Sequence, residues 1–128
     1  MACVRYYLEP VGVTGAPGAF TDGTFTFAIQ RPVGTPIARE VRGGPLPGLG
    51  TGAQCEITFA PSDAPVDLVF RNGTAWTLRA YGSNASPVVL QGASSTTPRV
   101  LQVATPGLWR IVIESGNETD ILEICRCG

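Results

Sequence analysis

Four cysteines are the residues of this chain best suited to chemistry: Cys3, Cys55, Cys125 and Cys127. Cysteine thiolates bind zinc, form disulfides and act as nucleophiles. Structural zinc sites usually combine two C-x2–4-C motifs, whereas this chain has only the C-x-C of Cys125 and Cys127. The spacing leaves four alternatives open: a metal site, free thiols, an intrachain disulfide, and a bond to another chain.

Strand alternation predicts that three of these cysteines lie on outer faces. Cys3 alternates with Val4, and both Cys125 and Cys127 alternate with Ile124. Because the two ends of a domain often lie close together, we predict that Cys3 is within bonding distance of Cys125 or Cys127. Residues i and i+2 of a strand are about 7 Å apart, so Cys125 and Cys127 are not expected to bond each other. A disulfide or cross-link through Cys3, Cys125 or Cys127 is therefore the site that the pattern favours.

Cys55 differs from the other three, because it shares a strand face with Ile57 and Phe59. A cysteine on an apolar face behaves as a small hydrophobic side chain, so we expect it to be buried and unreactive. A zinc site of four thiolates would need this buried residue. The sequence therefore assigns no metal ligand and no cofactor.

Alternation of apolar and polar residues also predicts the fold. The segment 24–30, TFTFAIQ, places Phe25, Phe27 and Ile29 on one face, which is typical of a half-buried strand. Similar patterns cover 54–59, 66–71, 76–79, 109–114 and 122–125, and 16 Gly and 11 Pro interrupt every helical pattern. We predict a single domain over residues 1–128: an all-β antiparallel sandwich of jelly-roll or Greek-key type, with about eight to ten short strands and little or no helix.

Turn signals separate these segments. The pair Asn72-Gly73, between Phe70 and Trp76, favours the type I′ turn of a β-hairpin. Two longer stretches, about 12–23 and 43–52, are rich in Gly and Pro and are predicted to be loops.

The second loop carries two leucines, Leu46 and Leu49, in a stretch otherwise made of Gly, Pro and Thr. An arm of this kind can pack on a neighbouring subunit, since the leucines give it apolar surface to bury. Leu46 and Leu49 are therefore predicted subunit-contact residues.

Trp76, Tyr81 and Trp109 are the residue types that stack on sugar rings. The alternation that places Ile111 inward also places Trp109 inward, and Trp76 falls on the inward face of its own strand. We therefore expect both indoles to pack in the core.

Charge excludes several functions. All nine basic residues are Arg, and the chain has neither His nor Lys. Histidine is the usual general base and lysine the usual amine nucleophile of enzymes. We therefore expect no enzyme activity and no catalytic residue. The Arg residues are dispersed and the net charge is −1, which disfavours nucleic-acid binding. No apolar stretch reaches the length of a membrane span or a signal peptide, so we expect synthesis in the cytoplasm without a signal peptide and no membrane contact.

A small, nearly neutral all-β domain without catalytic residues is well suited to be a subunit that assembles into a larger particle. We predict a structural or accessory subunit of a larger particle, specifically a virion-associated phage capsid decoration, head-spike or tail protein. Its partners would be other protein subunits, in a homo-oligomer or a capsid or tail lattice. The alternative is a carbohydrate-binding β-sandwich module with a glycan partner. Both hypotheses rest on elimination and analogy between folds.

Overall fold

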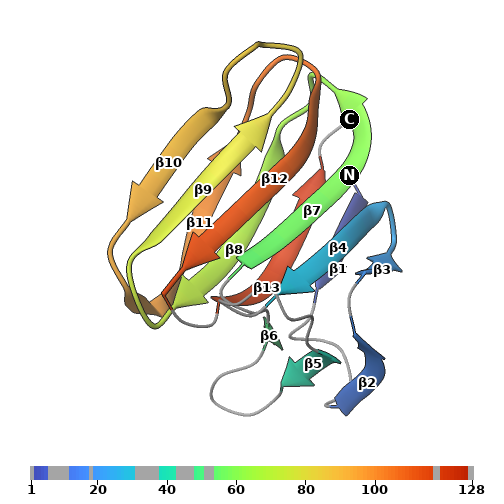
Figure 1. Ribbon diagram of the computed structural model, residues 1–128, viewed down its shortest axis with the longest axis vertical. Helices are drawn as coiled ribbons and strands as arrows, with labels where there is room; N and C mark the ends of the chain where they lie inside the picture. The colour runs from blue at the N-terminus through green and yellow to red at the C-terminus, as the bar shows by residue number, and fades with distance from the viewer. Residues whose placement is uncertain are drawn as a thin grey trace.

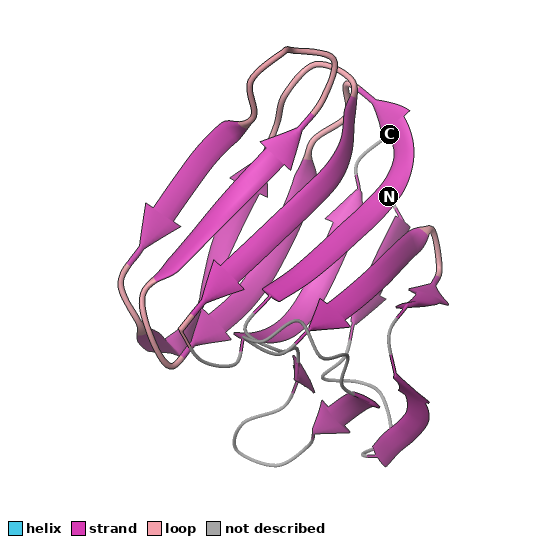
Figure 2. Ribbon diagram, in the orientation of Figure 1, coloured by secondary structure: helices cyan, strands magenta, loops and turns pink. Residues whose placement is uncertain are grey.

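The protein is a sandwich of two antiparallel β-sheets (Figure 1). The computed structural model describes residues 2–5, 12–17, 19–30, 38–42, 48–50, 54–116 and 119–126. Figure 2 shows strands and loops but no helix in this part of the chain. The prediction of an all-β antiparallel sandwich is confirmed. A search of the same residues for a helix that is long and apolar enough to cross a membrane finds none.

The seven-stranded sheet has the order β11-β8-β13-β6-β5-β2, and β1 also pairs with β13. Its strands are β1 (Ala2–Arg5), β2 (Gly12–Pro17), β5 (Ala38–Arg42), β6 (Gly48–Gly50), β8 (Val66–Asn72), β11 (Ser95–Val103) and β13 (Thr119–Arg126).

The six-stranded sheet has the order β10-β9-β12-β7-β4-β3. Its strands are β3 (Ala19–Asp22), β4 (Phe25–Gln30), β7 (Gln54–Ser62), β9 (Trp76–Tyr81), β10 (Val88–Gly92) and β12 (Leu108–Ser115). From β7 onward the chain crosses from one sheet to the other at every connection except the one from β9 to β10. Residues far apart in sequence are therefore brought together at each end of the sandwich.

The core follows the predicted alternation in the middle strands. Along β9, and along β7 as far as Phe59, every second side chain is buried, as strands covered on one face require. The core cluster includes Phe27, Ile57 and Leu78 with no exposed surface, and Phe25 packs edge-to-face on Phe59 with ring centroids 5.9 Å apart. Burial of such side chains is the main source of stability in a domain of this size.

The predicted hairpin at Asn72-Gly73 is wrong. Strand β8 belongs to the seven-stranded sheet and β9 to the six-stranded sheet, so the connection between them spans the two layers. Phe70 and Trp76 instead meet across the core, with their rings edge-to-face and 5.0 Å apart. Aromatic packing between the sheets outweighs the local turn preference of Asn-Gly.

The stretch 12–23 was predicted to be a loop, but β2 and β3 cover most of it. Strand β2 pairs with β5, and β3 pairs with β4 through a turn in which Gly23 has a positive φ of 58°. Main-chain N–H and C=O groups can complete a ladder even where the residues have small side chains or none.

In the stretch 43–52, β6 lies between β13 and β5, and Leu49 is opposite Ile121. Leu46 lies outside the described residues. No described contact tests the subunit-contact prediction for Leu46 and Leu49.

Candidate functional site

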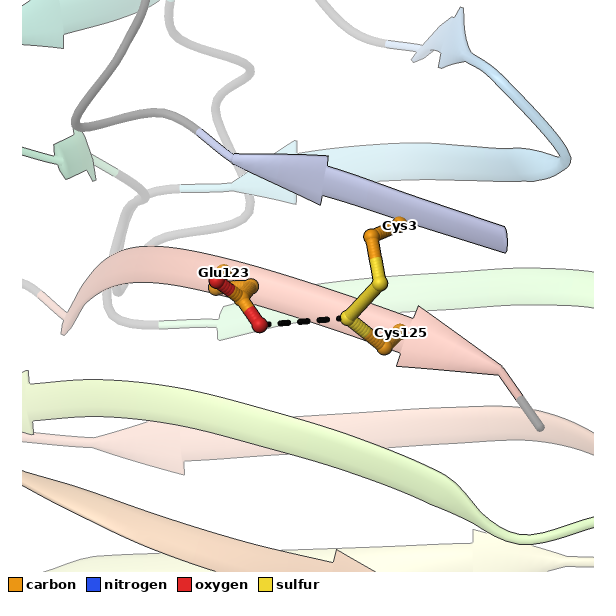
Figure 3. Close-up of side chains that lie close together, drawn as sticks. All are labelled: Cys3, Glu123 and Cys125. Carbon is orange, nitrogen blue, oxygen red and sulfur yellow. Dashed lines mark hydrogen bonds between the residues drawn. A yellow bond between two sulfur atoms is a disulfide. The ribbon is translucent and has the colours of Figure 1, made fainter. Parts of the chain in front are cut away.

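Cys3 and Cys125 lie directly opposite each other in the pairing of β1 with β13 and are joined by a disulfide (Figure 3). Their Cα atoms are 4.1 Å apart, and 122 positions separate them in sequence. Cys125 is 2% exposed although it is on the outer side of its sheet. Cys127 lies outside the described residues.

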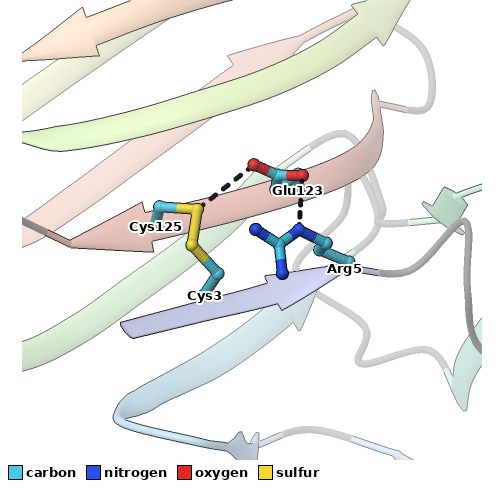
Figure 4. The surroundings of a disulfide bond; sticks show 4 residues. All are labelled: Cys3, Arg5, Glu123 and Cys125. Atoms are coloured by element: carbon cyan, nitrogen blue, oxygen red, sulfur yellow. Dashed lines mark hydrogen bonds and ion pairs between the residues drawn. A yellow bond between two sulfur atoms is a disulfide. The ribbon is translucent and has the colours of Figure 1, made fainter. Parts of the chain in front are cut away.

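Arg5 and Glu123 lie opposite each other on one side of this disulfide, two residues along their strands (Figure 4). Nε of Arg5 lies 3.1 Å from Oε2 of Glu123, and Oε1 of Glu123 lies 3.2 Å from Sγ of Cys125, which can carry a proton only when the disulfide is reduced. The sulfurs and this carboxylate lie within 4.8 Å of one another, which is close enough for a metal site. The disulfide, however, occupies both sulfurs, so the group acts as a cross-link.

Cys55 lies on β7 of the other sheet and has no exposed surface. Burial raises the pKa of its thiol far above the ordinary value, and the nearby Glu56 carboxylate adds to the shift. Because Cys55 faces the core while Cys3 and Cys125 lie on an outer face, four thiolates cannot meet at one metal ion.

Trp109 is exposed, which contradicts the prediction that both indoles pack in the core. Trp76 is buried, but Trp109 at the start of β12 is 40% exposed. Leu108 takes the inward position instead, with no exposed surface. The cause is an irregularity in the pairing of β12 with β7, where Leu108 lies opposite Ser62 but Arg110 lies opposite Thr58.

Arg126 holds this irregularity in place from the other sheet. Its Nη1 donates to the carbonyl of Ala60 at 2.8 Å, and its Nη2 donates to the carbonyls of Ser62 and Leu108 at 2.8 and 2.9 Å. Its guanidinium carbon also lies 4.5 Å from the centre of the Phe59 ring. One side chain thus satisfies three carbonyls at the place where the ladder is interrupted.

Arg110, the residue after Trp109, takes part in a stack of planar groups on the outer face of the six-stranded sheet. The guanidinium carbon of Arg110 lies 4.6 Å from the centre of the Tyr81 ring. Nη2 and Nε of Arg110 lie 2.8 and 2.9 Å from Oε2 of Glu56. The ion pair fixes the guanidinium over the ring and so limits the motion of all three side chains. We call Trp109, Tyr81, Arg110 and Glu56 the outer-face platform.

Polar side chains surround the platform on neighbouring strands of the same face. A second ion pair joins Nη1 of Arg79 to Oε2 of Glu114 at 3.3 Å. Other polar residues on this face include Thr21, Thr26, Gln54, Thr58, Thr77 and Gln91. In the described part of this face, each ion pair joins one Arg to one Glu, so the formal charges of the two pairs cancel.

Sequence reasoning missed the exposure of Trp109, although one signal was present. Pro61 interrupts the partner strand β7. Proline cannot donate to a ladder, so in strands it is found mainly at edges and irregularities. The run from Leu108 to Ile113 is apolar at both odd and even positions, and its pattern alone does not decide which residues face inward.

The comparisons with known proteins give structural neighbours only. No protein-family model matches the chain, and no curated protein matches it in sequence. The fold is similar to CBM51 from Clostridium perfringens GH95 in complex with methyl-galactose, with a TM-score of 0.42 and 13% identity over 97% of this chain and 100% of that one.

Two further solved structures resemble the chain. CBM51-2 of Clostridium perfringens ZmpB, in complex with GlcNAc, gives a TM-score of 0.43 and 10% identity over 98% of this chain and 31% of that one. CsCBM6-3 from Clostridium stercorarium, in complex with cellobiose, gives a TM-score of 0.38 and 14% identity over 98% of this chain and 92% of that one.

These three neighbours are carbohydrate-binding modules, and this finding contradicts the prediction of a virion assembly subunit. It agrees better with the alternative that the sequence left open. Likeness at such low identity concerns the fold alone, so a function has to be argued from the side chains of this chain.

Proposed function

We propose that the chain is a carbohydrate-binding module that holds an uncharged sugar on the outer-face platform. The observation that carries this proposal is the exposure of Trp109, which is 40% exposed and directly precedes Arg110, whose guanidinium lies over the Tyr81 ring. A large indole with two-fifths of its surface exposed offers an aromatic face to a ligand, and aromatic faces are well suited to bind the apolar face of a sugar ring.

The polar members of the platform provide hydrogen bonds around that ring. Glu56 accepts hydrogen bonds and Arg110 donates them, and their ion pair at 2.8 Å fixes both groups before a ligand arrives. Groups that are already fixed lose less conformational entropy on binding. Sugar hydroxyls both donate and accept, so they match this mixed set of groups.

Charge favours a neutral ligand. Arg110 pairs with Glu56 and Arg79 with Glu114, which leaves neither sign in excess in these two pairs. A charged sugar would have to break an ion pair, whereas a neutral sugar would not. Methyl-galactose, GlcNAc and cellobiose, the ligands of the three similar structures, are uncharged and are therefore the first probes.

The test is isothermal titration calorimetry with these sugars, preceded by a glycan array. Trp109→Ala should weaken binding about tenfold or more, because loss of one stacked aromatic removes on the order of 1.4 kcal/mol. Val100→Ala is the matched control, since Val100 is 75% exposed on the other sheet. Unchanged affinity of the Trp109 variant, or an array without any neutral ligand, would contradict the proposal.

We further propose binding without turnover. Glycoside hydrolysis needs one protonated and one ionised carboxyl group on either side of the bond that is cleaved. Glu56 and Glu114 are each held in an ion pair with an arginine, so neither carboxylate is free to flank a glycosidic bond in this way. Incubation of a bound disaccharide with the protein should release no monosaccharide, and release of one would refute this part of the proposal.

A further inference from the structure

A pocket lies at the Trp76 end of β9, away from the Tyr81 end that carries the platform, at the edge of the sandwich where the chain passes from β10 to β11. The edge strands β10 and β11 lie on the same side of the two sheets (Figure 1). The pocket has a volume of about 370 Å³ and is lined by Ala75, Trp76, Thr77, Gln91, Gly92 and Ala93. It is large enough for a monosaccharide-sized molecule.

The wall of this pocket contains a buried hydrogen-bond donor without a partner. Trp76 is 5% exposed, and its indole Nε1 has no hydrogen bond. Gly92 lies directly opposite Trp76 in the ladder, and a Cβ at this position would come within 2.9 Å of Nε1. Glycine is therefore required at position 92, because the indole packs against its main chain and any Cβ there would collide with the ring.

Arg99 brings a positive charge to the same place. Arg99 lies opposite Phe70 in the ladder and faces inward, and its guanidinium carbon lies 5.4 Å from the centre of the Trp76 ring. Its Nη2 donates to the carbonyl of Ala93, a pocket residue, at 2.7 Å. Its Nε is buried without a partner, and no described carboxylate pairs with it.

The unpartnered atoms are concentrated at this end of the core. The described residues contain four buried side-chain atoms without a hydrogen-bond partner, and Nε1 of Trp76, Nε of Arg99 and Oδ1 of Asn72 are three of them. Asn72 lies opposite Ser95, and Ser95 is the first residue of β11 after the chain crosses from β10. Buried polar groups are nearly always satisfied in folded proteins, so the two donors Nε1 of Trp76 and Nε of Arg99 indicate a place where an acceptor can bind, whereas Oδ1 of Asn72 needs a donor and is not part of that argument.

We propose that this pocket binds the carboxylate group of a small organic acid. The two oxygens of a carboxylate accept two hydrogen bonds, and Nε1 of Trp76 and Nε of Arg99 are two donors. The negative charge compensates the guanidinium, whose contacts among the described residues are with two aromatic rings and a carbonyl. A neutral hydroxyl would satisfy one donor but leave the charge unpaired. The site is separate from the outer-face platform and takes a ligand of different charge.

The experiment uses the two indole N–H signals in the ¹⁵N–¹H correlation spectrum of the full chain, assigned with Trp76→Phe. Sodium glucuronate, sodium butyrate and glucose are titrated at constant pH and ionic strength. We expect the Trp76 signal to shift with glucuronate and not with glucose. A shift with butyrate as well would mean that the carboxylate alone is sufficient, while a shift with glucuronate only would mean an acidic sugar. Both results support the proposal.

Arg99→Gln should weaken glucuronate binding about tenfold or more, and Arg99→Lys should weaken it less because the charge remains. The titration of the unaltered protein is decisive even if these variants fold poorly. Equal shifts with glucose, or no shift with either acid, would overturn the proposal and leave a bound water as the partner of the indole. Trp109→Ala should leave the Trp76 titration unchanged, so failure of the platform and failure of this pocket can be told apart.

Discussion

Nη2 of Arg126 lies 2.9 Å from the carbonyl oxygen of Leu108, the residue that precedes Trp109. This bond joins β13 of one sheet to the start of β12 in the other. Cys125, the residue before Arg126, is fixed to β1 by the disulfide with Cys3. The position of the exposed indole therefore depends on the strand that carries the cross-link.

Arg126→Lys should destabilise the protein by about 1–3 kcal/mol, because one ammonium cannot satisfy the three carbonyls that the guanidinium fork reaches. Urea unfolding gives the free energy, and sugar titration should show weaker binding in the folded variant. Arg5→Lys is the control, since the Arg5 side chain is 46% exposed and its ion pair is worth less than about 1 kcal/mol. Equal losses in both variants would argue against a special role for Arg126.

Cys3→Ser should lower the free energy of unfolding by about 4–5 kcal/mol, because the disulfide closes a loop of more than a hundred residues in the unfolded chain. Urea unfolding with and without a reductant measures this loss, and the reductant should have no further effect on the variant. Cys127→Ser should leave the stability unchanged. If Cys127→Ser removed the reductant effect instead, the pairing of Cys3 with Cys125 would be wrong.

Cys55 should make the protein less stable at alkaline pH. Its thiol stays protonated in the core, because burial raises its pKa, while the unfolded chain loses that proton above the ordinary thiol pKa of about 8.5. Above that pH the unfolded state binds fewer protons, so stability falls by up to about 1.4 kcal/mol per pH unit, whereas below it the contribution is constant. Cys55→Ala should show a smaller alkaline loss between pH 8.5 and 10. Parallel stability curves for the two proteins would contradict this prediction.

The two tryptophans should respond differently to truncation. Trp76→Ala should lower the free energy of unfolding by about 3–5 kcal/mol, because the ring is 5% exposed and packs on Phe70. Trp109→Ala should lower it by less than about 1 kcal/mol, as expected for an exposed side chain outside the core. Chemical unfolding of both variants measures the difference. A large loss in the Trp109 variant would mean that the indole has a packing role and would weaken the proposal for the platform.

Local sequence determines which residues of the regular strands face inward. Phe27, Ile57 and Leu78 were assigned to inward faces by alternation, and all three have no exposed surface. Cys55 follows the same rule. Successive side chains of a strand point to opposite faces whatever the partner strand is, so this information is present in the segment itself.

Tertiary structure decided the connection at Asn72-Gly73 and the exposure of Trp109. Asn72-Gly73 favours a hairpin, but Phe70 and Trp76 pack against each other from two different sheets. The sequence of the turn carries no information about the energy of that contact. Trp109 faces outward because β7 and β12 pair irregularly, and Arg126 of β13 holds the irregular carbonyls. Ladder register and long-range hydrogen bonds are properties of strand pairs rather than of single strands, so no pattern within residues 108–113 alone could assign the exposed indole.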